Sequence, residues 1–168
     1  MVITKSHKDL KPFLMDPGKK GIKNPYYQIL ADGQIIFVVS PGLNGSEFNK
    51  TTVFLNNYPG VQVFQCLYGQ GIILMQRMDE EGEAKEFKVV SLSPGRQVNI
   101  PAGWALCLVN VGKSFLVVIA NIDVEGDSKK SKGIIEKQGL VYYVVEKKGE
   151  ISFEPNPNYR IHPQISTE

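Results

Sequence analysis

Histidine, cysteine and tryptophan are scarce in this chain of 168 residues, which contains two histidines, two cysteines and one tryptophan. The histidines, His7 and His162, stand near opposite ends of the sequence, where we expect each to face solvent. Cys66 and Cys107 lack the CxxC spacing of a zinc site or a redox pair. The sequence therefore predicts no metal and no cofactor from its chemistry-bearing side chains.

Long apolar runs and excess charge are absent as well. No segment approaches the ~20 apolar residues of a membrane-spanning helix, and the first residues lack the apolar core of a signal peptide. The net charge is +2, from 19 basic and 17 acidic residues, and the basic residues are scattered. We expect a cytoplasmic protein that binds neither nucleic acid nor a membrane.

Short runs of β-branched and aromatic residues dominate what is present, and no stretch carries a clear helical period. Glycine, proline and asparagine separate the runs. The predicted strands are Gln34–Val39, Thr51–Leu55, Val61–Leu67, Gly71–Arg77, Lys85–Leu92, Gln97–Ile100, Trp104–Asn110, Ser114–Asn121, Leu140–Glu146 and Ile151–Glu154. This pattern predicts an all-β sandwich or small barrel over residues 31–155, with an N-terminal arm over 1–30 and a C-terminal tail over 156–168. Residues 123–132 are polar and predict a long loop.

Alternation along the predicted strands assigns side chains to faces. In Trp104–Asn110, Trp104 and Leu106 share one face, and Ala105 and Cys107 share the other. Both faces are apolar, so we expect the sheet to be covered on both sides, by a second sheet or by a dimer contact. Cys107 then points away from the barrel interior and Cys66 points into it, which leaves both as free thiols.

A spaced motif carries a family resemblance. Gly95, Pro101, Gly103 and Asn110 stand at the spacing Gly-(x)5-Pro-x-Gly-(x)2-His-(x)3-Asn of the second cupin motif, with Leu106 in place of the histidine. The segments "VFQCLYGQGIILMQ" and "GIIEKQGLVYYVVEKKGEISFEPNPNY" resemble the cupin-type glucose-6-phosphate isomerases of archaea and bacteria. The likeness covers roughly Gly33 to Tyr159. It implies a double-stranded β-helix, a jelly-roll-like barrel, and a homodimer.

The resemblance also implies where a metal site would lie. That family holds a divalent ion with a His-x-His pair, a glutamate and a later histidine. With a one-residue gap before the first motif, these positions fall on Val53, Leu55, Gln62 and Leu106. None of the four is a metal ligand of the family type. The resemblance therefore implies a barrel without its metal ion, and a neutral Gln62 cannot act as the enolising base.

The former ligand positions and their neighbours are the candidate pocket. The predicted lining residues are Thr51, Thr52, Val53, Leu55, Gln62, Phe64, Trp104 and Leu106. Either apolar side chains have refilled the interior, which we favour, or a pocket stays open for a small neutral or sugar-phosphate ligand. Lys50, Thr51 and Thr52 are candidate phosphate contacts, although ordinary strand residues fit better. The acidic hairpin from Asp79 to Glu86 is predicted to be a solvated turn.

The sequence and the resemblance together leave three functions open. The first is a metal-free cupin that serves as a non-catalytic binding or structural module. The second is glucose-6-phosphate isomerase activity, which the length of the likeness supports. The third is a homodimer whose interface is its essential property, since fold alone does not fix function.

Overall fold

Two antiparallel sheets form the barrel in the computed structural model, which describes residues 1–56, 60–122 and 132–168. The six-stranded sheet has the order β1-β2-β3-β12-β7-β10. Its strands are β1 (Val2–Lys5), β2 (Tyr26–Ala31), β3 (Gln34–Val39), β12 (Leu116–Ala120), β7 (Gln62–Tyr68) and β10 (Gln97–Ile100).

The second sheet has five strands in the order β15-β9-β8-β11-β6. They are β15 (Ile165–Thr167), β9 (Ala84–Leu92), β8 (Gly71–Met78), β11 (Trp104–Asn110) and β6 (Phe54–Leu55). All seven residues of β11 are buried, which matches the two apolar faces read from its sequence. The all-β prediction is confirmed.

Side chains of the two sheets meet in one interior cluster. It includes Phe37 of β3, Phe64 of β7, Met75 of β8 and Leu106 of β11. Each strand contributes every second residue, as the period of a β-strand requires. This cluster is the core of the barrel, and three of the predicted lining residues, Phe64, Trp104 and Leu106, belong to it.

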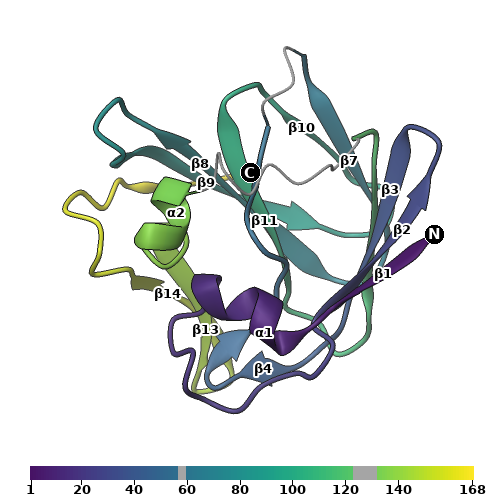
Figure 1. The fold of residues 1–168 in the computed structure, drawn as a ribbon, viewed down its shortest axis with the longest axis horizontal. Coiled ribbons are helices and arrows are strands. Elements are labelled where there is room, and N and C mark those ends of the chain that lie inside the picture. The colour runs from purple at the N-terminus through teal and green to yellow at the C-terminus, as the bar shows by residue number, and fades with distance from the viewer. Residues whose placement is uncertain (57–59, 123–131) are drawn as a thin grey trace.

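A covering layer lies on the outer face of the five-stranded sheet (Figure 1). It consists of the strands β4 (Leu43–Asn44), β5 (Glu47–Phe48), β13 (Tyr142–Lys147) and β14 (Glu150–Pro155), with the short helices α1 (His7–Leu10), η1 (Lys11–Phe13) and α2 (Lys132–Glu136). Phe13, Ile134 and Val144 from this layer pack in a second cluster with Cys107 of β11. The chain therefore buries this outer face itself. The suggestion that the outer face of Trp104–Asn110 forms a dimer contact is wrong.

The first thirty residues are not simply an external arm. β1 and β2 pair with each other and with β3, so they extend the six-stranded sheet. Between them, Ser6 caps α1 by a reciprocal pair of bonds with Asp9, the capping box of a helix start. At the other end of the chain, β15 pairs with β9 in parallel. The residues after β14 thus also contribute to a sheet.

A buried ion pair fastens the N-terminal segment to the covering layer. The Lys50 ammonium lies 2.6 Å from a carboxylate oxygen of Glu47, and both side chains are almost fully buried. Lys50 Nζ also donates to the carbonyl oxygen of Phe13 at 2.6 Å, and Glu47 Oε1 accepts from the amide of Met15 at 2.9 Å. The Tyr143 ring lies 5.2 Å from the same ammonium. Each charge is therefore satisfied by its partner and by backbone.

We expect Lys50→Met to lower the free energy of unfolding by about 3–5 kcal/mol, because it leaves the Glu47 charge buried without its partner. Adding Glu47→Gln should recover a large part of the loss, since an amide oxygen still accepts from Met15 and no charge remains. Urea unfolding of both variants measures the effect. A double variant no more stable than Lys50→Met would contradict this account of the pair.

Candidate functional site

Leu106 lies at the centre of the barrel interior. In the β11 register it stands opposite Met75 of β8 and Phe54 of β6, and it is fully buried. Cross-strand partners share a face, so all three side chains point into the same space. The position that a metal-binding histidine would occupy is thus enclosed by apolar groups.

Three phenylalanines complete this environment. The Phe37 and Phe54 rings lie 5.3 Å apart, tilted by 49°, and the Phe37 and Phe64 rings lie 6.2 Å apart, nearly parallel. These separations are those of favourable aromatic pairs. Phe64, Trp104 and Leu106, three of the predicted lining residues, belong to this interior cluster. The fold brings these three residues together as part of the packed core.

Val53 and Leu55 do not belong there. Both pack in the second cluster, on the side of the covering layer. The reason is register: Ala105 stands opposite Leu55 while Leu106 stands opposite Phe54. The one-residue gap assumed from the sequence moved these side chains to the wrong face, because a shift of one residue inverts a strand.

Phe54 and Asn56 are two residues apart, as the histidines of a His-x-His pair are, and they lie on the inward-facing side of the chain. The Asn56 amide is fully buried and donates to the carbonyl oxygens of Ile100, at 2.9 Å, and Gly60, at 3.3 Å. Its backbone N–H donates to Trp104 O at 2.9 Å, so Asn56 fixes the turn between β10 and β11. Sequence reasoning missed both residues.

Gln62 begins β7 opposite Ile100, an interior residue, so it lies on the interior face and is half-buried. Its amide carries no charge and offers no base. Charged side chains that face the interior lie on β8 and β9 of the five-stranded sheet. Arg77 binds Glu86 at 2.8 Å, and this hydrogen bond lowers the pKa of Glu86. Lys88 Nζ lies 5.5 Å from the centre of the Trp104 ring.

The candidate phosphate contacts are engaged inside the protein. Thr51 Oγ1 donates to the carbonyl oxygen of Thr52 at 2.8 Å and accepts from the amide of Leu108 at 3.1 Å. Thr52 Oγ1 lies 2.8 Å from the Tyr26 hydroxyl, and burial raises the pKa of Tyr26 to about 12. Lys50 is held by Glu47. This arrangement supports the reading of Thr51 and Thr52 as structural residues.

The donor set does not fit a metal ion. The described residues contain no group of three or more histidine, cysteine, aspartate or glutamate side chains able to hold one. His162 is exposed, as predicted, and its Nε2 lies 2.8 Å from Asn156 O. His7 is only partly exposed, so its prediction as a solvent-facing residue is wrong. Cys66 and Cys107 are free and lie in different clusters, as expected.

The acidic hairpin between β8 and β9 is not wholly a solvated turn. Glu83 is buried, accepts from the amide of Arg160, and lies 3.5 Å from Lys137 Nζ. Burial alone would raise the pKa of Glu83, but backbone hydrogen bonds and the Lys137 charge outweigh it and lower the pKa. Glu83 therefore anchors the tail to the hairpin, whereas Glu80 and Glu81 are exposed as predicted.

Comparison with known proteins identifies related sequences. The model of the family described as Glucose-6-phosphate isomerase (GPI) matches residues 23–161. The glucose-6-phosphate isomerase of Pyrococcus furiosus is 32% identical over 124 residues, 73% of this chain and 62% of the relative. That of Thermococcus litoralis is 30% identical over 125 residues, 74% of this chain and 62% of the relative. The chain thus spans less than two thirds of these relatives' length, and the predicted resemblance is confirmed.

Solved structures match parts of the chain at low sequence identity and low TM-score. A Drosophila melanogaster CENP-C cupin domain is 11% identical with a TM-score of 0.43, over 67% of this chain and 92% of that one. Oxalate oxidase in complex with the substrate analogue glycolate is 13% identical with a TM-score of 0.42, over 52% of this chain and 39% of that one.

No helix in the described residues is long and apolar enough to span a membrane.

A filled interior predicts a large cost for removing its central side chain. We expect Leu106→Ala to lower the free energy of unfolding by about 2–5 kcal/mol, through lost burial and a residual cavity. Ile151→Ala, on the exposed side of β14, is the matched control and should change it by about 0.5 kcal/mol or less. Urea unfolding compares the two. Equal, small effects would indicate an open pocket around Leu106 instead of a packed core.

Proposed function

The chain belongs to the glucose-6-phosphate isomerase family, and we propose that it is a metal-free member without isomerase activity that serves as a structural module. The observation that carries this proposal is the fully buried Leu106, packed against Met75 and Phe54 where a ligand set would have to stand. Hydrocarbon at this position neither binds an ion nor moves a proton.

Isomerisation of a sugar phosphate requires particular chemical groups. Moving a proton between two adjacent sugar carbons needs a base and a group that stabilises the negative oxygen of the intermediate. Gln62 is neutral, and Phe54 and Leu106 are apolar. Arg77 and Glu86 face each other in a partly exposed pair. Both stand in the interior-facing row of Trp104, so the Glu86 carboxylate that a base would require is already engaged by Arg77.

The packing also bears on the choice between a ligand-binding and a structural module. Phe37 and Phe64 are fully buried and stack within the interior. A small neutral or sugar-phosphate ligand in the barrel would have to displace these rings, at a cost of several kcal/mol of burial, about 1.5–3 kcal/mol for each side chain. The filled interior therefore favours the structural role.

Isomerase activity is the alternative, and it rests on sequence likeness to relatives that carry that name. We expect the purified protein to hold much less than one equivalent of iron, manganese, nickel or zinc by elemental analysis. We also expect no conversion of fructose 6-phosphate above background in a coupled assay, with manganese or iron added. The Pyrococcus furiosus relative is the positive control. Stoichiometric metal or turnover that survives repurification would overturn the proposal.

The outer face of the six-stranded sheet supports an assembly role. The strand registers align two rows of outward side chains across β2, β3, β12 and β7. The rows contain Tyr27, Val38, Val117 and Tyr68, and Ile29, Ile36, Ile119 and Gln65. None of these side chains is charged, and none is fully buried. When one face of an antiparallel sheet packs on the core, the residues on the solvated face are normally polar. The two uncharged rows depart from this pattern.

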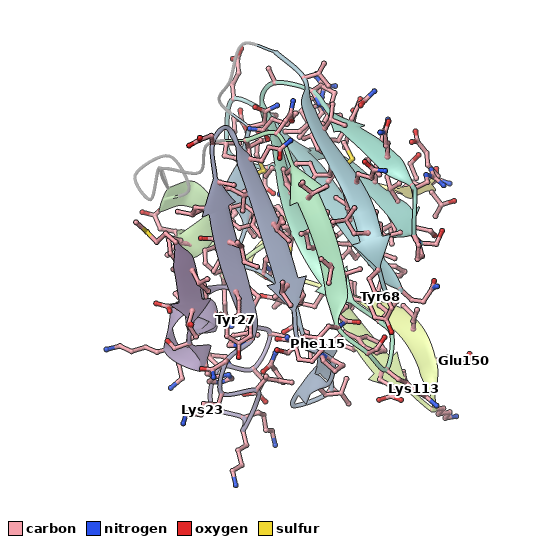
Figure 2. The ribbon with its side chains drawn as sticks, turned by 90° about the vertical axis from the view of Figure 1, so that its right-hand side faces the viewer. Lys23, Tyr27, Tyr68, Lys113, Phe115 and Glu150 are labelled. Carbon is pink, nitrogen blue, oxygen red and sulfur yellow. The ribbon has the colours of Figure 1, made fainter. Side chains whose placement is uncertain are left out.

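Aromatic side chains concentrate at one end of this face. Figure 2 shows Tyr27, Phe115 and Tyr68 there, with Lys23, Lys113 and Glu150 around the lower edge. Tyr68 and Phe115 are 57% and 46% exposed. An apolar centre with a charged rim is the composition of a protein interface.

We propose a second copy of this chain as the occupant. Six strands at about 4.8 Å spacing, each about 17 Å long, give a flat face of about 490 Å², and relief and rim residues add to it. The flat area alone is more than half of the roughly 800 Å² per partner of a standard interface. An uncharged face is self-complementary, as a two-fold contact requires.

Val38→Glu should convert the dimer to a monomer, because it places a charge at the centre of this face, where pairing would desolvate it. Ile151→Glu, on the exposed β14, should leave the dimer intact. Sedimentation velocity at micromolar concentration distinguishes the states, and circular dichroism checks that both variants fold. A wild-type monomer under these conditions would rule the dimer out.

A further inference from the structure

A basic surface cleft lies next to the first helix, away from the barrel interior. It has a volume of about 360 Å³ and is lined by His7, Lys11 and the loop from Pro17 to Gly21. This volume is in the range of small-molecule sites. The lining precedes residue 23, where the family match begins, so the cleft is a feature of this chain outside that match.

One sign of charge dominates the lining. Lys11, Lys19 and Lys20 contribute to it, and no aspartate or glutamate does. Within the described residues, none of these three ammonium groups forms an ion pair. The whole chain carries a net charge of only +2, so this is a local concentration of positive charge. A cleft lined by one sign of charge raises the local concentration of oppositely charged ligands.

The loop is held in place by the elements behind it. The amide of Ile22 donates to Asn44 Oδ1 at 2.9 Å, and the amide of Gly45 donates to the carbonyl oxygen of Lys20 at 3.2 Å. Gly21 packs so closely that a Cβ atom would overlap Asn44 and the His7 ring. These contacts fix the backbone that presents Lys19 and Lys20.

His7 adds a second, independent observation. Both ring nitrogens are shielded from solvent, and neither has a hydrogen-bond partner among the residues that the structure describes. Shielded polar atoms without a partner are uncommon in folded proteins. The ring lies against Gly21, itself part of the cleft lining, so a ligand bound in the cleft would change the surroundings of this imidazole.

We propose that this cleft binds the phosphate group of a small phosphate monoester. Lysine ammonium groups bind phosphate as point charges, and three of them match a dianion better than a single carboxylate. The volume leaves room for the organic group as well as for the phosphate. This site does not depend on the barrel interior, so it is compatible with a structural module and with an enzyme.

The test compares glycerol 3-phosphate with inorganic phosphate and glycerol by isothermal titration at low ionic strength. We expect glycerol 3-phosphate to bind more tightly than inorganic phosphate, glycerol not to bind, and added salt to weaken the binding. Lys19→Gln with Lys20→Gln should weaken it about ten-fold or more, because each charged contact is lost. Lys85→Gln with Lys148→Gln is the control with the same change of charge and should bind like the wild type.

The two histidines give a structural readout. The His162→Gln variant leaves a single imidazole signal in the NMR spectrum, which assigns His7. Saturation with glycerol 3-phosphate should shift the His7 signal and leave the His162 signal of the wild type in place. Equal loss of binding in both lysine variants, a stationary His7 signal, or inorganic phosphate binding as tightly as the ester would each overturn the proposal.

Discussion

The packing of Leu106 against the Phe37, Phe54 and Phe64 rings is the interaction on which the barrel and its chemistry both depend. Burial of each such side chain stabilises the fold by about 1.5–3 kcal/mol, and here they occupy the space between the two sheets. A metal centre in the same space would need imidazoles and carboxylates pointing inward. The residues that stabilise the barrel therefore occupy the position at which such a centre would stand, and the proposed loss of isomerase activity rests on this.

The two sheets differ in how their outer faces are treated. The outer face of the five-stranded sheet is covered by the chain itself, through the β13–β14 hairpin, α2 and the segment around Phe13. The Glu47–Lys50 pair fastens that segment, because Glu47 accepts from the Met15 amide and Lys50 donates to the Phe13 carbonyl oxygen. Among the residues that the structure describes, none forms such a cover over the outer face of the six-stranded sheet. Its uncharged rows are the surface on which we propose that a second copy binds.

Particular residues show how much of the site could be predicted from the sequence. Trp104 and Leu106 were assigned to the correct face, because β11 is an uninterrupted strand whose alternation follows from its sequence. Val53 and Leu55 were assigned to the wrong face, because an alignment gap of one residue inverts a strand. Strand alternation alone could not predict the direction of the Tyr68 side chain. A register shift between Val117 and Val118 inserts a residue in β7 and turns Tyr68 outward.

The sequence by itself determined the all-β class, the family, and the absence of imidazoles from the centre of the barrel, because residue type, turn spacing and strand alternation are local properties. Only the tertiary structure decided that Phe54 faces the interior, that the chain itself covers the outer face of the five-stranded sheet, and that His7 and three lysines line one cleft. Those outcomes depend on which strands become neighbours, and residues distant along the chain set that pairing.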